Sequence, residues 1–210
     1  MLIKSISGVR GLVETSFTPQ TVPQYANAVH KILSDGAIIL GRDSRPSGEE
    51  ISMKIADELV HLGRNVIDCG IVPTPTVQFM VGETDSAGGI IVTASHNPIE
   101  WNGLKFLDDD GCFLNADKME NLLSTSPETI TIEKGNIIEF GNAYLKHISN
   151  ILNLNCIDIN KIKNKKFKVV VDTVNGAAYK ALPELLEELN CDVIKIHCEN
   201  TGKFPRGTEP

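Results

Sequence analysis

The side chains best able to do chemistry stand together in one short segment, Thr93-Ala94-Ser95-His96-Asn97-Pro98. This segment follows an apolar run, residues 88–92, that is typical of a buried strand. Open α/β sheets bind their ligands in loops at the carboxyl ends of strands, so we expect Ser95 to be exposed on such a loop. An exposed serine can act as a nucleophile or carry a phosphoryl group if a nearby group activates it. The same residues would also form an ordinary turn fixed by Asn97-Pro98, and turn chemistry alone leaves both interpretations open.

Several familiar catalytic patterns are missing from the sequence. No G-x-S-x-G elbow surrounds Ser95, and we expect the adjacent His96 not to reach back easily to its hydroxyl, which argues against a serine hydrolase. No G-x-G-x-x-G motif opens a helix after a strand, and no P-loop occurs. The cluster Asp108-Asp109-Asp110-Gly111 lies between two strand-like runs, so we predict a hairpin turn there rather than a metal site.

The elements that must position the Ser95 loop alternate between β-rich and helical stretches, which is the pattern of an α/β fold. Strands are expected at residues 37–40, 65–69, 87–93, 104–107 and 112–114. Helices are expected at residues 20–33, 47–62, a short segment ending at 81, 117–123 and 142–152. Ser47 and Glu50 have the spacing of a capping box at the start of the second helix, and Gly63 is placed to end it. We predict a mixed sheet between helices.

A second unit begins at Lys168-Val169-Val170-Val171-Asp172, which resembles the first unit in being an apolar strand that ends on a carboxylate. We predict three parts: a complete first domain at 1–135, a connector helix and linker at 136–165, and the start of a second, similar α/β domain at 166–210. The lysines between 161 and 168 are expected to lie on a solvated linker. Two strands and one helix make a marginal sheet, so we expect the chain to be a fragment.

The composition excludes several classes of partner. The 210 residues carry 20 Lys and Arg against 27 Asp and Glu, a formal net charge of −7, which disfavours nucleic acid. No apolar run approaches the roughly 20 residues that span a bilayer, and the amino terminus lacks the apolar stretch of a signal peptide. The five cysteines are widely spaced and form no C-x-x-C pair, which indicates a reducing compartment. We therefore expect a cytoplasmic protein that binds neither nucleic acid nor membrane.

Four ordered segments are similar to motifs of the α-D-phosphohexomutases, the superfamily of phosphoglucomutase, phosphomannomutase and phosphoglucosamine mutase. They are Ser7-Gly8-Val9-Arg10-Gly11, Gly41-Arg42-Asp43-Ser44-Arg45-Pro46-Ser47-Gly48, Thr93-Ala94-Ser95-His96-Asn97-Pro98 with Asn102-Gly103-x-Lys105, and Phe204-Pro205 through Thr208-Glu209-Pro210. The resemblance spans nearly the whole chain. It implies a phosphoryl shuttle between hexose 1-phosphate and hexose 6-phosphate through a hexose 1,6-bisphosphate.

The resemblance also implies roles for single residues. Phosphorylated Ser95 would transfer its phosphoryl group and bind Mg²⁺, while Arg10 would supply positive charge. Lys105 would be the acid/base and His96 would orient the phosphoryl oxygens or the substrate. Asn97 and Asn102 would contact the substrate. The residues themselves leave plainer alternatives open: Arg10 as a surface arginine, Lys105 as a solvent-side strand residue and His96 as a turn histidine.

The sequence departs from the family by lacking three further motifs. These are the Asp-Gly-Asp-x-Asp-Arg metal loop, the Gly-Glu-x-Ser-Gly sugar loop and the phosphate-gripping loop. Magnesium held by Ser95 alone would be weak, because this hard cation needs several oxygen ligands. We therefore expect a phosphohexomutase parent whose 210-residue part is inactive alone, with self-association through exposed surfaces. The alternative is a non-catalytic module that binds sugar phosphates or a partner. Arg42, Asp43 and Arg45 are interpreted as a local ion-pair brace.

Overall fold

The Ser95 loop emerges from a seven-stranded mixed sheet. The computed structural model describes residues 1–126 and 134–206 of the chain. The strands are β1 (Leu2–Ser5), β2 (Gly8–Leu12), β3 (Ala37–Arg42), β4 (Val66–Ile71), β5 (Ser86–Val92), β6 (Trp101–Leu107) and β7 (Ile137–Glu139). Their order in the sheet is β1-β2-β6-β5-β3-β4-β7. Strand β3 pairs parallel with β4 and β5, and β4 pairs parallel with β7, whereas β6 is antiparallel to both β5 and β2.

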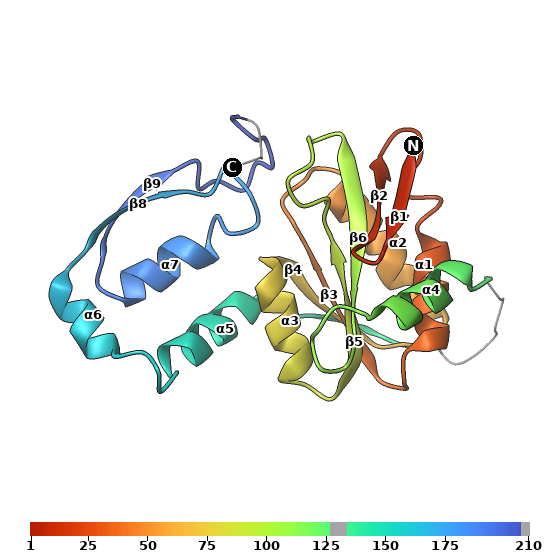
Figure 1. Cartoon of the computed structure of the whole chain (residues 1–210), viewed down its shortest axis with the longest axis horizontal. Helices are drawn as coiled ribbons and strands as arrows, with labels where there is room; N and C mark the ends of the chain where they lie inside the picture. The colour runs from red at the N-terminus through yellow and green to blue at the C-terminus, as the bar shows by residue number, and fades with distance from the viewer. Residues whose placement is uncertain (127–133, 207–210) are drawn as a thin grey trace.

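Helices cover both faces of this sheet, which confirms the predicted architecture (Figure 1). They are α1 (Pro23–Ile32), α2 (Gly48–His61), α3 (Thr74–Gly82), α4 (Ala116–Ser124) and α5 (Ala143–Leu152). The alternation of side chains along β3 divides the core, because Ile38 and Leu40 pack with α1, α2 and α4 while Ile39 packs with α3 and α5. Strand β5 is buried along its whole length, so its sequence is almost continuously apolar.

Two local predictions about α2 have different outcomes. Gly63 follows the helix with a φ of +83°, as expected for a residue that ends a helix. The capping box at Ser47 is wrong, because Ser47 has helical backbone angles and makes no side-chain cap bond. Its hydroxyl instead accepts a 2.9 Å hydrogen bond from Nδ2 of Asn102, and this contact competes with capping.

The acidic turn before Cys112 is a hairpin, as predicted. The backbone N–H of Asp108 donates to the carbonyl of Cys112 at 2.9 Å, and Leu107 bridges Phe113 in antiparallel fashion. Within residues 1–126 and 134–206, no group of three or more His, Cys, Asp or Glu could hold a metal ion. The expected turn-rich stretch at 124–135 lies mostly outside the described residues.

The second unit holds two parallel strands, β8 (Lys168–Asp172) and β9 (Asp192–Ile196), with helix α7 (Ala181–Glu188) between them in sequence. Most of the lysine-rich stretch forms helix α6 (Ile159–Lys165), which Asp158 caps by accepting from the N–H of Lys161. No residue of α6 is buried, which confirms that these lysines are solvated. Strand β7 lies within residues 136–165, where we expect a connector, and it extends the first sheet. No described helix is long and apolar enough to cross a membrane.

Candidate functional site

A cavity of about 240 Å³ opens where β2, β6 and the end of β5 lie side by side. The sheet register places Arg10 of β2 opposite Gly103 of β6, and Lys105 of β6 opposite Ile91 of β5. The cavity is lined by Ser5, Ser7, Gly8, Val9, Arg10, Thr93, Ala94, Ser95, His96, Leu104 and Lys105. Four of the predicted site residues, Arg10, Ser95, His96 and Lys105, therefore share one cavity although they come from three segments.

Gly103 allows these three segments to approach closely. A Cβ at this position would clash with the carbonyl oxygen of Val9, and it would lie 2.9 Å from the Cβ of Arg10 and 3.0 Å from the carbonyl oxygen of Thr93. Real side chains do not tolerate such contacts with backbone. The glycine in the Asn102-Gly103-x-Lys105 segment is thus required by the packing of the cavity wall.

Ser95 is exposed and has a left-handed backbone, with a φ of +58°. A residue other than glycine pays roughly 1–2 kcal/mol for this conformation, so surrounding contacts must hold it. One such contact is its own N–H, which donates to Oγ1 of Thr93 at 3.0 Å. Its hydroxyl lies 3.4 Å from Nδ1 of His96. The expectation that His96 would not reach the hydroxyl is therefore wrong, although a contact of this length is weak.

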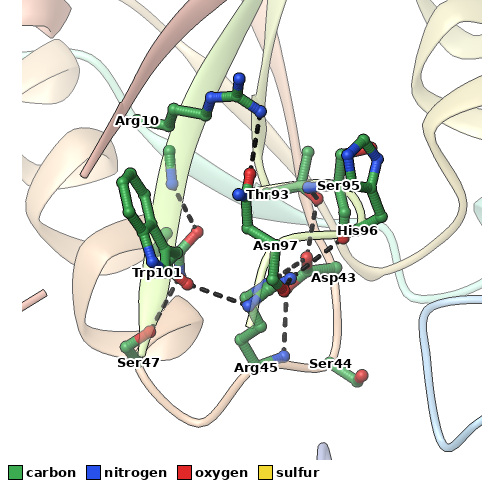
Figure 2. A network of polar contacts seen from close by, with 12 residues as sticks. Arg10, Asp43, Ser44, Arg45, Ser47, Thr93, Ser95, His96, Asn97 and Trp101 are labelled. Carbon is green, nitrogen blue, oxygen red and sulfur yellow. Dashed lines mark hydrogen bonds and ion pairs between the residues drawn. The ribbon is translucent and has the colours of Figure 1, made fainter. Parts of the chain in front are cut away.

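The main support for the loop is the buried side chain of Arg45, which is 1% exposed. Figure 2 shows its guanidinium beneath the loop, surrounded by backbone oxygen atoms. Its five N–H groups donate to the carbonyls of Ser95 (3.0 Å), Asn97 (2.7 Å), Pro98 (2.6 Å) and Trp101 (3.0 Å), and to Oδ2 of Asp43 (3.0 Å). These are all the hydrogen bonds that an arginine can donate.

Asp43 balances the charge of Arg45 and joins the two loops. Its Oδ2 also accepts a 2.7 Å hydrogen bond from the hydroxyl of Thr93, and its Oδ1 accepts from the backbone N–H of Arg45. The predicted ion-pair brace is present between Asp43 and Arg45, while Arg42 lies 4.0 Å from Glu49 instead. The sequence did not reveal that the same arginine holds the Ser95 loop, because its partners there are backbone carbonyls, which leave no pattern in residue types.

Two cationic side chains face the cavity. Arg10 is half-buried, and its Nη1 donates to Oδ1 of Asn97 at 2.8 Å, so Asn97 adjoins the site through Arg10. Lys105 is also half-buried, with Nζ 5.2 Å from the centre of the Phe113 ring. None of the described lining residues is acidic. The cavity therefore favours an anion.

Asn102 does not join the other predicted site residues. Its side chain is fully buried, with Nδ2 bonded to the Ser47 hydroxyl and Oδ1 accepting from the N–H of Gly103. In this structure its amide links the start of β6 to the start of α2.

A complete magnesium site is not formed by the residues that the structure describes around the cavity. Ser95 offers one oxygen atom, and the nearby carboxylate of Asp43 is already bonded to Arg45 and Thr93. Magnesium prefers six oxygen ligands in octahedral geometry. These residues do not fit the ion by themselves.

Comparison with known proteins agrees with this arrangement. The model of phosphoglucomutase/phosphomannomutase α/β/α domain I matches residues 2–131, and the model of α/β/α domain II matches residues 142–210. The chain belongs to the phosphoglucomutase/phosphomannomutase family. This confirms the resemblance that the four motifs indicate, although residues 207–210 of the last motif lie outside the described part.

Curated relatives within the phosphoglucomutase/phosphomannomutase family are about twice as long as this chain. A phosphoglucomutase/phosphomannomutase of Thermococcus kodakarensis is 35% identical over 97% of this chain and 46% of its own length. A phosphoglucosamine mutase of Alkaliphilus metalliredigens is 30% identical over 93% of this chain and 45% of its own length. A crystal structure of a family protein from Burkholderia thailandensis has the same fold, with a TM-score of 0.80 at 24% identity over 97% of this chain and 46% of that chain.

Proposed function

We propose that this chain forms the phosphoserine-bearing part of a phosphohexomutase, in which Ser95 carries the phosphoryl group between the two ends of a hexose phosphate. The observation that carries the proposal is the exposed Ser95 hydroxyl, held in a left-handed conformation on the wall of a cationic cavity. A phosphoserine brings a charge of about −1.5 to −2 at neutral pH, and Arg10 and Lys105 supply opposite charge.

In the proposed reaction, a hydroxyl oxygen of the hexose monophosphate attacks the phosphorus atom of phosphorylated Ser95. The new O–P bond forms as the bond to Oγ of Ser95 breaks. The proton that the attacking hydroxyl loses ends on Oγ, so the products are a serine hydroxyl and a hexose 1,6-bisphosphate. Lys105 is the acid/base that moves this proton, and His96 orients the phosphoryl oxygens. The return transfer from the other end of the sugar restores phosphorylated Ser95. Positioning and charge stabilisation supply most of the catalysis in such transfers.

We propose that Asn97 contacts the sugar phosphate, because it is already bonded to Arg10 at the cavity edge. A similar role for Asn102 would require its buried hydrogen bonds to break. Phosphorylated Ser95 would provide one ligand to Mg²⁺, with the remaining ligands from elsewhere. For this reason, and because the chain spans less than half of its relatives, we propose that the 210 residues alone turn over hexose phosphate poorly.

The direct test is phosphoryl transfer to the intact chain. On incubation with glucose 1,6-bisphosphate or mannose 1,6-bisphosphate, mass spectrometry should show one phosphoryl group that peptide mapping assigns to Ser95. The Ser95→Ala variant should remain unmodified, while Ser149→Ala, which removes an exposed hydroxyl on α5, should be modified normally. Absence of modification in the wild-type chain would overturn the proposal. Bisphosphate binding without modification would favour a non-catalytic binding module, and labelling of Ser95 by a fluorophosphonate would favour a hydrolase.

We also propose that the chain self-associates through the outer face of β8 and β9. Val170, Ile194 and Ile196 are 59%, 46% and 38% exposed there. Contiguous exposed apolar side chains favour association. Light scattering should give a concentration-dependent mass for the wild-type chain and a constant mass for Val170→Lys. A constant monomer mass for the wild-type chain would contradict this.

A further inference from the structure

Ser44 and Arg45, which follow Asp43, both contact the second unit. The Ser44 hydroxyl donates a 2.7 Å hydrogen bond to the carbonyl of Asn175, and both residues are buried. The Phe204 ring lies against the Arg45 guanidinium, with 5.1 Å between the ring centre and Cζ. Residues 44 and 45 are therefore held by the second unit on one side, while Arg45 holds the Ser95 loop on the other.

The backbone of the second unit is shaped for this contact. Gly202 has a φ of +61°, and a Cβ at this position would overlap the carbonyl oxygen of Ser44. Only glycine combines this backbone with so close an approach. The backbone at Gly202 thus lies directly on Ser44, with no room for a side chain between them.

Asn175 is a rigid acceptor within the second unit. Its backbone N–H donates to the carbonyl of His197 at 2.6 Å, its Nδ2 donates to the carbonyl of Lys203 at 3.0 Å, and its Oδ1 accepts from the N–H of Glu199 at 3.1 Å. These bonds connect the segment after β8 to the segment that carries Phe204. Both contacts with residues 44 and 45 therefore come from one hydrogen-bonded body.

A planar guanidinium can donate from its edge and stack on an aromatic ring through its face at the same time. Arg45 does both, and its side chain is 0% exposed. The Phe204 ring helps to keep water from the guanidinium, and hydrogen bonds in a water-poor environment are stronger. The orientation of the guanidinium sets the positions of the carbonyls of Ser95 and Asn97.

We infer that Phe204 is a positioning residue for Ser95. Its ring fixes the Arg45 guanidinium, which fixes the backbone of the Ser95 loop, so docking of the second unit controls how well the loop presents its hydroxyl. The effect on phosphoryl transfer rests on the proposed function. The effect on the loop itself does not.

The fluorescence of the single tryptophan, Trp101, can report on the loop, because the Trp101 carbonyl accepts a hydrogen bond from Arg45 at the end of the loop. The N–H groups of Asn97 and Trp101 are bonded to the carbonyls of Ala94 and Pro98, so their hydrogen exchange reports opening of the loop. We expect Phe204→Ala to accelerate this exchange about fivefold, which corresponds to loss of a stacking contact of about 1 kcal/mol. The same variant should increase quenching of Trp101 fluorescence. Phe204→Tyr should keep the exchange rate and the Trp101 quenching at their wild-type values. Phe204→Leu should give values between those of the wild-type chain and Phe204→Ala.

Phe167→Ala is the matched control, because Phe167 is a phenylalanine of the second unit that is 51% exposed. It should leave exchange at Asn97 and Trp101 unchanged. Ser44→Ala provides an independent test, since it removes the other contact while leaving Phe204 in place, and it should also accelerate the exchange. If exchange and quenching in Phe204→Ala match those in Phe167→Ala, the inference is wrong. If loop exchange responds but Ser95 is never phosphorylated in the wild-type chain, the positioning stands and the proposed function fails.

Discussion

The buried guanidinium of Arg45 donates a 3.0 Å hydrogen bond to the carbonyl of Ser95, fifty residues further along the chain. This contact joins the loop after β3 to the loop after β5, at the carboxyl edge of two parallel strands. The reactive residue proposed here is therefore held by an arginine that never faces the cavity.

Replacing Arg45 by lysine should destabilise the protein by about 3 kcal/mol and abolish phosphorylation of Ser95. Lysine keeps the charge but cannot reach five acceptors in one plane, so several carbonyls lose their donor in a buried place. Urea unfolding measures the change. Arg42→Lys is the control, because that side chain is partly exposed and its ion pair with Glu49 is long. This variant should change stability by less than about 1 kcal/mol. Equal effects of the two substitutions would contradict this assignment.

Two substitutions that remove the Ser95 hydroxyl should differ in stability. Ser95→Gly and Ser95→Ala both abolish phosphorylation, but only glycine adopts a φ of +58° without strain. We expect the glycine variant to be more stable than the alanine variant by about 0.5–1 kcal/mol, after allowing for the greater chain entropy of glycine in the unfolded state. Thermal unfolding of the two variants at equal concentration tests this. A more stable alanine variant would show that the loop does not hold a left-handed residue 95.

Gly103→Ala should cost about 2–3 kcal/mol, because its methyl group would press on the backbone of β2 and of Thr93. The cavity wall must then widen, so binding of a hexose bisphosphate should weaken as well. Gly141→Ala is the control, since a Cβ there meets nothing within 4 Å. Chemical denaturation and calorimetric titration measure both effects, and a Gly103→Ala variant as stable as Gly141→Ala would refute the packing argument.

The junction of α3 and α5 should make stability depend on pH. Nδ1 of His147 lies 3.0 Å from Oγ1 of Thr76, and the His147 ring stacks on the Phe79 ring with 4.8 Å between the ring centres. Burial lowers the pKa of His147 in the folded protein. The unfolded chain therefore binds the proton more tightly, so stability is full above a pH of about 6.5 and falls as the pH drops through that value towards the lower folded pKa.

His147→Gln should reduce this pH dependence. Denaturation midpoints measured at about pH 5 and pH 7.5 should differ less in the variant than in the wild-type protein. His30 contributes in the same direction, because burial and the charge of Arg64 lower its pKa, so part of the dependence should remain. An unchanged difference in the variant would exclude His147 as a source.

The sequence predicts the sheet, most helices and the exposed Ser95 loop, because hydrophobic periodicity and turn residues act locally. It does not predict the role of Arg45, since four of its five acceptors are backbone carbonyls on a distant segment. The buried hydrogen bond between Asn102 and Ser47 also joins two distant segments, so no sequence pattern predicts it, although both residues are polar. The lysine-rich segment shows the reverse case, because its charge suggests a linker while Asp158 starts a helix there. Site geometry depends on contacts between segments, which residue spacing does not record.

The strand order also has a consequence for synthesis of the chain. Strands β1 and β2 form a hairpin that joins the rest of the described sheet through β6, and Arg10 reaches Asn97 across a separation of 87 residues. Long-range pairing of this kind forms slowly, after the local contacts. The hairpin that brings Arg10 to the cavity is synthesised before β6, so the edge of β2 that pairs with β6 stays open until β6 follows. We expect the cavity to be completed late in folding, when that edge is finally paired.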